Sequence, residues 1–142
     1  MRRLIATAMS LALILGACGG DDSDPAAVLA DYVEAFNTGD ADAVMVFYAE
    51  DAVIEGHPTV DGVTATGKSE ILAIEQRMQI NQELTGRLEF TNMVVSGNTV
   101  TFDDIFHNEE GDCFSGVGHQ ITVEDDKITL YVFGDLDADL CP

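Results

Sequence analysis

A short stretch, residues 62–69, carries a pattern with a known chemical use. Its sequence, GVTATGKS, matches the phosphate-binding loop G-x-x-x-x-G-K-[ST] at every fixed position. In such a loop, backbone N–H groups cradle the phosphates of a nucleotide and the lysine, here Lys68, contacts them. The pattern raises nucleotide binding as a hypothesis that the surrounding sequence has to support.

The sequence around this match does not support a nucleotide site. A phosphate-binding loop follows directly from a buried strand and opens a helix. Here the preceding apolar run ends at Ile54, and a polar stretch with Pro58 intervenes. The chain also has no repeated strand–helix–strand units. We expect Gly67 and Lys68 to begin a helix, with no nucleotide bound despite the match.

Asp104 is a candidate for acid–base chemistry. It alternates with Val100, Phe102 and Phe106 on one face of a predicted strand, so its carboxyl lies among apolar side chains. An acid in such surroundings has a raised pKa and can exchange protons near neutral pH. The alternative is that the strand reaches solvent at this residue. No cluster of His, Asp and Glu has metal-ligand spacing, so we expect neither a metal nor another cofactor.

The first 24 residues are predicted to be a targeting segment outside the fold. Two arginines precede an apolar run of signal-peptide length that ends in Leu-Gly-Ala-Cys at Cys18. This ending resembles the lipobox of bacterial lipoproteins, which implies cleavage before Cys18 and its acylation. We expect a signal peptide at 1–17, a lipidated cysteine with a flexible tether at 18–24, and an extracytoplasmic domain at 25–142 held to the cell envelope. The alternative is an ordinary secretory signal.

The charge of the chain excludes one large class of partner. Asp and Glu number 26 against six Lys and Arg, which gives a formal net charge of −20. Nucleic-acid binding needs a basic patch, which so few scattered cations cannot build. The same acidity repels anionic membrane surfaces, so membrane attachment has to come from the lipid anchor.

Cys113 and Cys141 are expected to form a disulfide. Export places them in an oxidising compartment, where paired cysteines usually bond. The bond would tie the C-terminal tail to a strand. The alternative is a pair of buried thiols.

Hydrophobic periodicity predicts an α+β domain. The period is helical up to Leu84 and is two residues afterwards, so helices precede an antiparallel meander. Asp24 is a suitable N-cap and Pro25 a suitable first helical residue. The expected helices cover 25–36, 40–48 and 68–81, and the expected strands cover 51–56, 86–97, 99–111, 112–124 and 127–137.

Residues 31–58, DYVEAFNTGDADAVMVFYAEDAVIEGHP, and the following TGKSEI resemble the NTF2-like superfamily, especially its SnoaL-like and ketosteroid-isomerase-like branches. The resemblance extends over nearly all of residues 25–136. It implies a cone in which three N-terminal helices pack on a strongly curved antiparallel sheet around an apolar pocket. It also implies a homodimer, since dimers are common in this superfamily.

The catalytic groups of the isomerase branch carry over only in part. Tyr32 matches its helix-one tyrosine, whereas its two acids would fall at Gly56 and Gly118. Steroid isomerisation is therefore not expected. His57 can replace the lost base, since imidazole exchanges protons near pH 7. The alternatives are a solvent-facing loop histidine at 57 and a core aromatic at 32.

Two functions remain open. We expect a non-catalytic lipoprotein that binds a small apolar molecule or an envelope protein in or around the cone pocket. The alternative is a SnoaL-like acid–base enzyme, an isomerase, cyclase or hydratase, that uses Tyr32, His57 and Asp104. His119 is expected on the strand face of Val117, in a core or surface role. The expected pocket residues are Phe36, Phe47, Phe102, Phe106, Val117 and His119.

Overall fold

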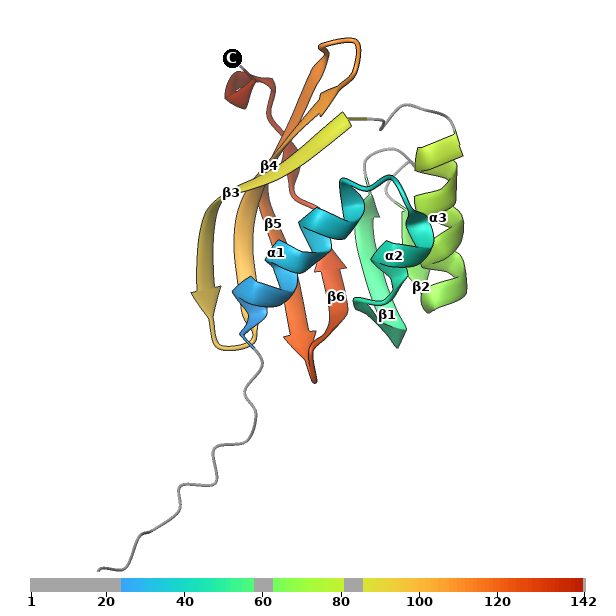
Figure 1. The fold of residues 1–142 in the computed structure, drawn as a ribbon. Helices are drawn as coiled ribbons and strands as arrows, with labels where there is room; N and C mark the ends of the chain where they lie inside the picture. Colours follow the sequence, from blue (N-terminus) through green and yellow to red (C-terminus); the bar gives the residue numbers. More distant parts are fainter. Residues whose placement is uncertain (1–23, 58–62, 81–85, 142) are drawn as a thin grey trace, which may run out of the picture.

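The computed structural model describes residues 24–57, 63–80 and 86–141, which form three α-helices, a curved sheet and one short 3-10 helix, η2 (Figure 1). The predicted signal peptide, Cys18 and its tether up to residue 23 lie outside the described residues, so lipidation stays a prediction. The helices are α1 (Pro25–Phe36), α2 (Ala41–Met45), α3 (Lys68–Ile80) and η2 (Ala138–Leu140). The strands are β1 (Tyr48–His57), β2 (Val63–Thr66), β3 (Gly86–Ser96), β4 (Thr99–Asn108), β5 (Cys113–Glu124), β6 (Lys127–Val132) and β7 (Asp135–Leu136).

The sheet confirms the α+β class and corrects one expectation about it. Its strand order is β2-β1-β6-β5-β4-β3, with β7 added to β5. All neighbours pair antiparallel except β1 and β6, which run parallel, so the sheet is mixed. Figure 1 shows α1 lying across one face of the sheet and α2 and α3 beside β1 and β2. The helices and the sheet enclose the core between them.

The first helix forms as its sequence predicts. The Asp24 carboxylate accepts a hydrogen bond from the Ala26 N–H, and Pro25 follows the cap. Leu29 and Tyr32 are buried on its apolar side. Just past its end, the Asn37 amide bonds both the N–H and the C=O of Leu88 in β3, at 2.8 and 3.0 Å. This pair of bonds fixes α1 over the sheet.

The second helix is shorter than expected, and the strand after it is longer. α2 ends at Met45, whereas we expected Phe47 and Tyr48 on the helix. Tyr48 instead begins β1, pairs with Ile128 of β6 and is fully buried. The aromatic and β-branched residues of this stretch fit a buried strand better than a helix end. The shift places the Tyr48 side chain inside the cone.

The disulfide between Cys113 and Cys141 is present and ties the tail to β5, as expected. Additional bonds support the tail: the Asp137 N–H donates to the Ser115 carbonyl, and the Ser115 hydroxyl donates to the Asp137 carbonyl. No helix in the described part of the chain is long and apolar enough to cross a membrane.

Reduction of this disulfide is expected to lower the free energy of unfolding by about 3 kcal/mol, because the bond restricts the unfolded chain. The two cysteines are 28 residues apart in sequence. Urea unfolding with and without reductant measures the effect. A Cys113→Ser/Cys141→Ser double variant is the control and should not respond to reductant. Equal wild-type midpoints in both conditions would contradict the bond.

Candidate functional site

Three tyrosines and a glutamate gather inside the cone, and we call them the tyrosine–glutamate cluster. Tyr32 comes from α1, Tyr48 from β1, Glu75 from α3 and Tyr131 from β6. All four side chains are buried, with Glu75 only 2% exposed. The Tyr32 and Tyr48 hydroxyls lie 3.4 Å apart and form a hydrogen bond. The cluster therefore contains side chains from two helices, α1 and α3, and from two strands of the sheet, β1 and β6.

The electrostatics of the cluster centre on Glu75. Burial raises the pKa of its carboxyl from 4.5 to about 7. No described residue donates a hydrogen bond to its Oε2. Burial raises the pKa of Tyr48 well above its ordinary value, and the nearby Glu75 raises it further. Tyr32 and Tyr131 shift in the same direction, first through burial and then through neighbours that include Glu75. The cluster thus contains an acid that changes protonation near pH 7.

Our sequence reasoning missed Glu75, although a signal for it exists. Glu75 directly follows Ile74 and lies four residues after Ile71, and both isoleucines are buried. Residues spaced in this way share one helix face. A glutamate within the apolar stripe of a helix is expected to be buried, and a buried acid indicates a functional site more often than a surface one.

Asp104 meets His119 instead of Tyr32. The His119 Nε2 lies 3.2 Å from the Asp104 Oδ1, a close electrostatic contact whose angles fall outside hydrogen-bond geometry. The Gly134 N–H donates to the His119 Nδ1 at 3.1 Å. A nitrogen that accepts a hydrogen bond carries no proton, so the ring proton lies on Nε2 and faces Asp104. His119 is thereby oriented on both sides.

A bulge in β5 brings this pair together and corrects the expected strand face. Asp104 pairs with Gly116 and Phe102 pairs with His119, so β5 carries one extra residue between them. Gly118 at this point has a φ of +73°, which glycine adopts without strain. We had expected Val117 to share the His119 face of the strand, and the bulge shows that it does not. Gly116 does, and a Cβ there would overlap the His119 ring.

A second bulge turns His57 into the protein. Gly56 has a φ of +76°, and the β1–β2 register shifts between Ile54 and His57. The His57 side chain is buried at the end of β1, which corrects the alternative of a solvent-facing loop histidine. Burial lowers the pKa of His57 to about 4, so its ring is neutral at pH 7. Gly56 and Gly118, the positions at which the family resemblance places the isomerase acids, are thus both bulge residues followed by an inward histidine.

Aromatic rings connect these groups along the sheet. Phe133 lies between the histidines, with ring centroids 4.5 Å from His57 and 5.5 Å from His119. His119 stacks on Phe102 at 5.4 Å. Phe102 contacts Tyr131 at 6.0 Å, which leads to the tyrosine–glutamate cluster.

The candidate catalytic residues Tyr32, His57 and Asp104 lie on three different elements, α1, β1 and β4. Among the expected pocket residues, Phe36 and Phe47 pack against Tyr32, and Phe102 packs against His119. Phe106 lies farther along β4 beside Phe114, away from this interior.

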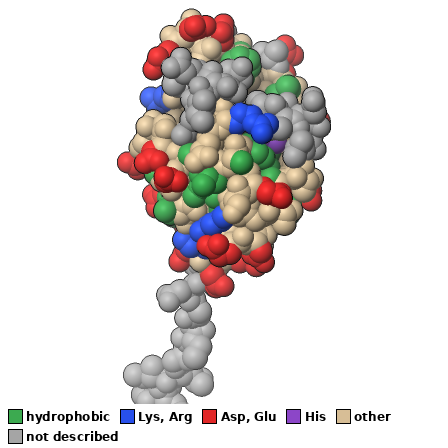
Figure 2. Space-filling model, turned by 90° about the vertical axis from the view of Figure 1, so that its right-hand side faces the viewer, with side chains coloured by type: hydrophobic (Ala, Val, Ile, Leu, Met, Phe, Trp, Pro, Cys, Tyr) green, Lys and Arg blue, Asp and Glu red, His purple; other side chains and the backbone are tan. Residues whose placement is uncertain are grey.

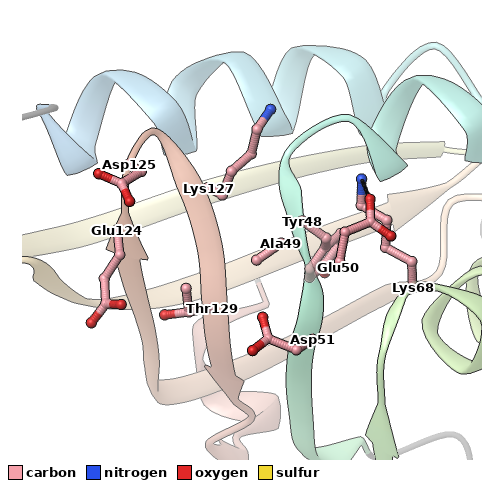
Figure 3. A pocket seen from close by; sticks show the side chains of 9 residues that line it. All are labelled: Tyr48, Ala49, Glu50, Asp51, Lys68, Glu124, Asp125, Lys127 and Thr129. Atoms are coloured by element: carbon pink, nitrogen blue, oxygen red, sulfur yellow. Dashed lines mark ion pairs between the residues drawn. The ribbon is translucent and has the colours of Figure 1, made fainter.

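Two hollows lie on the outside of the molecule, and neither includes Glu75, His57 or His119. The first, of about 360 Å³, lies between the start of β1 and the β5–β6 hairpin and includes exposed carboxylates (Figure 3). Its Lys68 pairs with Glu50 at 3.0 Å, and its Lys127 donates to the Val46 carbonyl. The second, of about 310 Å³, lies between α1 and β3. In the described part of the chain, no group of three or more His, Cys, Asp and Glu could hold a metal ion.

The segment that matches the phosphate-binding pattern is a strand and a helix start. Val63–Thr66 form β2 and pair with β1, a strand that is absent from those expected from the sequence. The Thr66 N–H donates to the Glu70 carboxylate and the Gly67 N–H to the Ala52 carbonyl, at 2.8 and 2.7 Å. These amides are already paired within the protein. The absence of nucleotide binding stays a prediction, which this geometry supports.

Comparison with solved structures shows the same fold. A protein from Kribbella flavida, named as a candidate ketosteroid isomerase, is 17% identical with a TM-score of 0.64, covering 80% of this chain and 77% of its own. A candidate polyketide cyclase from Xanthomonas campestris is 25% identical with a TM-score of 0.59, covering 77% and 87%. A protein of ketosteroid-isomerase-like fold from Catenulispora acidiphila, in complex with trimethylamine, is 16% identical with a TM-score of 0.61, covering 75% and 82%.

Sequence comparison identifies the family. No curated protein matches the chain. The sequence model of the SnoaL-like domain matches residues 29–131, which include the tyrosine–glutamate cluster, both inward histidines and Asp104. The chain therefore belongs to the SnoaL-like domain family.

Proposed function

We propose that the chain is a binding protein that takes up one small, largely apolar molecule inside the cone. The observation that carries this proposal is the buried Glu75 carboxyl, whose Oε2 no described residue satisfies. The rise of its pKa from 4.5 to about 7 corresponds to about 3 kcal/mol against the ionised form. A ligand that pairs with this oxygen would offset that unfavourable term.

The residue types of the interior match those that bind a small molecule with an apolar body. Aromatic side chains supply contact area, and a few polar groups fix orientation, which is typical of small-molecule sites. The Catenulispora acidiphila protein of this fold was crystallised with trimethylamine, which supports the idea that the fold can accommodate a small ligand. Attachment to the cell envelope through Cys18 is part of the same proposal.

A second candidate function is acid–base catalysis, which the His119–Asp104 contact favours. A histidine oriented by a carboxylate on one side and a backbone N–H on the other has a defined proton position. Such an orientation is common for a general acid or base. This candidate assigns proton transfer to His119, with Asp104 as the residue that positions it. The neighbours named as cyclase and isomerase give this candidate a precedent in the fold alone.

Binding inside the cone is expected to change the NMR signals of the interior. We expect 2-naphthol, an aromatic probe with one hydroxyl, to shift the amide signals of Tyr32, Glu75 and Tyr131 in the purified chain. The comparison group is Glu124 and Asp125, which line an outside hollow. Shifts confined to that hollow, or none at millimolar probe, would contradict the proposal.

The contribution of Glu75 to the stability of the free protein should fall as the pH rises from 4.5 to 7. The unfolded Glu75 loses its proton near 4.5 and the folded one near 7, so the native state holds more protons in this window. Relative to Glu75→Gln, the wild type should lose about 3 kcal/mol over this range and nothing further above it. Urea unfolding measures the difference. A difference independent of pH would mean that Glu75 is not a buried, unpaired acid.

The catalytic candidate predicts a single tautomer for His119. Nitrogen-15 NMR of the imidazole should show a protonated Nε2 and a bare Nδ1, because the Gly134 N–H occupies Nδ1. His107 is exposed and serves as the control, with exchange between tautomers. A protonated Nδ1 in His119 at neutral pH would contradict the orientation on which this candidate rests.

A further inference from the structure

The Glu75 carboxyl has no counter-charge among the described residues. The described basic side chains are occupied or lie outside: Lys68 pairs with Glu50, Lys127 bonds the Val46 carbonyl, and Arg77 and Arg87 are exposed. Buried carboxylates are normally paired with a cation or with several hydrogen-bond donors. The partner that Oε2 lacks is therefore a donor or a positive charge, and the described residues supply neither to it.

Three tyrosines interact electrostatically with Glu75, and aromatic rings attract cations. Tyr32, Tyr48 and Tyr131 all lie near enough for Glu75 to raise their pKa. The Tyr32 ring in turn packs at 6.0 to 6.3 Å from Phe36, Phe47, Tyr48 and Phe90. The π-face of an aromatic ring carries partial negative charge and holds an ammonium ion, most strongly in a dry site. A carboxylate among such rings is complementary to an organic cation.

The negative charge of the whole chain also favours a cationic ligand over an anionic one. The chain has a formal net charge of −20, and on the face of the molecule in Figure 2 acidic side chains lie around a central group of hydrophobic side chains, with basic side chains among them. A field of this sign raises the local concentration of cations and opposes anionic ligands. A neutral ligand would leave the ionised Glu75 carboxylate without a counter-charge, whereas a cation would supply one.

We propose that the interior ligand is a small organic ammonium ion, with its charge at the Glu75 carboxylate and its alkyl groups against the tyrosine rings of the cluster. This inference rests on the proposed function, because it assigns a chemical class to the molecule bound in the cone.

The inference fixes how binding depends on pH. An ammonium ion pairs with the ionised carboxylate, so binding has to release the proton that Glu75 holds below pH 7. The affinity should therefore rise about tenfold per pH unit up to about pH 7 and then level off. A neutral ligand that accepts a hydrogen bond from the protonated acid would show the opposite trend.

Two matched probes test the charge directly. Choline carries a quaternary ammonium, and 3,3-dimethylbutan-1-ol has the same shape with carbon in place of nitrogen. Calorimetric titration of the purified chain at pH 5, 6, 7 and 8 should show choline binding that tightens with pH, and at least tenfold weaker binding of the alcohol. Glu75→Gln should weaken choline binding at least tenfold and leave the alcohol unchanged. Glu34→Gln, at an exposed position of α1, should bind like the wild type.

Four results would overturn the inference. Equal binding of the alcohol and choline, or unchanged choline binding in Glu75→Gln, would remove the charge from recognition but keep a small-molecule site. Absence of choline binding at millimolar concentration would also reject the ammonium class, and the 2-naphthol experiment would then decide the proposed function separately. If Glu75→Gln does not fold, the pH dependence of the wild type still decides, since a flat or falling affinity contradicts the inference.

Discussion

The Glu75 carboxyl is buried in the interior of the cone, and this burial constrains what the rest of the structure can do. Its unfavourable ionisation, about 3 kcal/mol, is large against the 5 to 15 kcal/mol that roughly separates folded from unfolded domains. An apolar side chain of similar size would pack in the core without this loss. A carboxyl at this position is consistent with binding or proton transfer and does not contribute to stability. Under the proposed function, the tyrosines around it would provide contact area and orientation for a ligand.

The curvature of the sheet determines which other polar groups reach this interior. Each bulge adds one residue to a strand, bends it and reverses the side-chain alternation beyond it. At Gly56 and Gly118 the residue after the bulge is a histidine, and both histidines are buried on either side of Phe133. The same bulge in β5 places His119 beside Asp104. The two β-bulges therefore both curve the sheet and place the two histidine side chains in the interior.

The features that could be predicted from the sequence are those set by local pattern. The Asp24 cap and the apolar face with Tyr32 predicted α1, alternation predicted β3 to β6, and Cys113 with Cys141 predicted the disulfide. The parallel pairing of β1 with β6 depends on contacts distant in sequence and has no local signal. The bulge at Gly118 was missed because strict alternation was counted through it. Glu75 was missed because only an acid on a strand, Asp104, was considered as a buried acid. Its place in the apolar stripe of a helix nevertheless indicates that it is buried.

The most direct test of this account is the titration of Glu75 itself. Carbon-13 NMR would follow its side-chain carboxyl in the free protein from pH 4 to 9, with Glu75→Gln to assign the signal. The account predicts a midpoint near 7, the value that burial without a partner gives this acid. A midpoint near 4.5 would contradict it, because the carboxyl would then be hydrated or paired, and the interior would hold no unsatisfied acid for a ligand to meet.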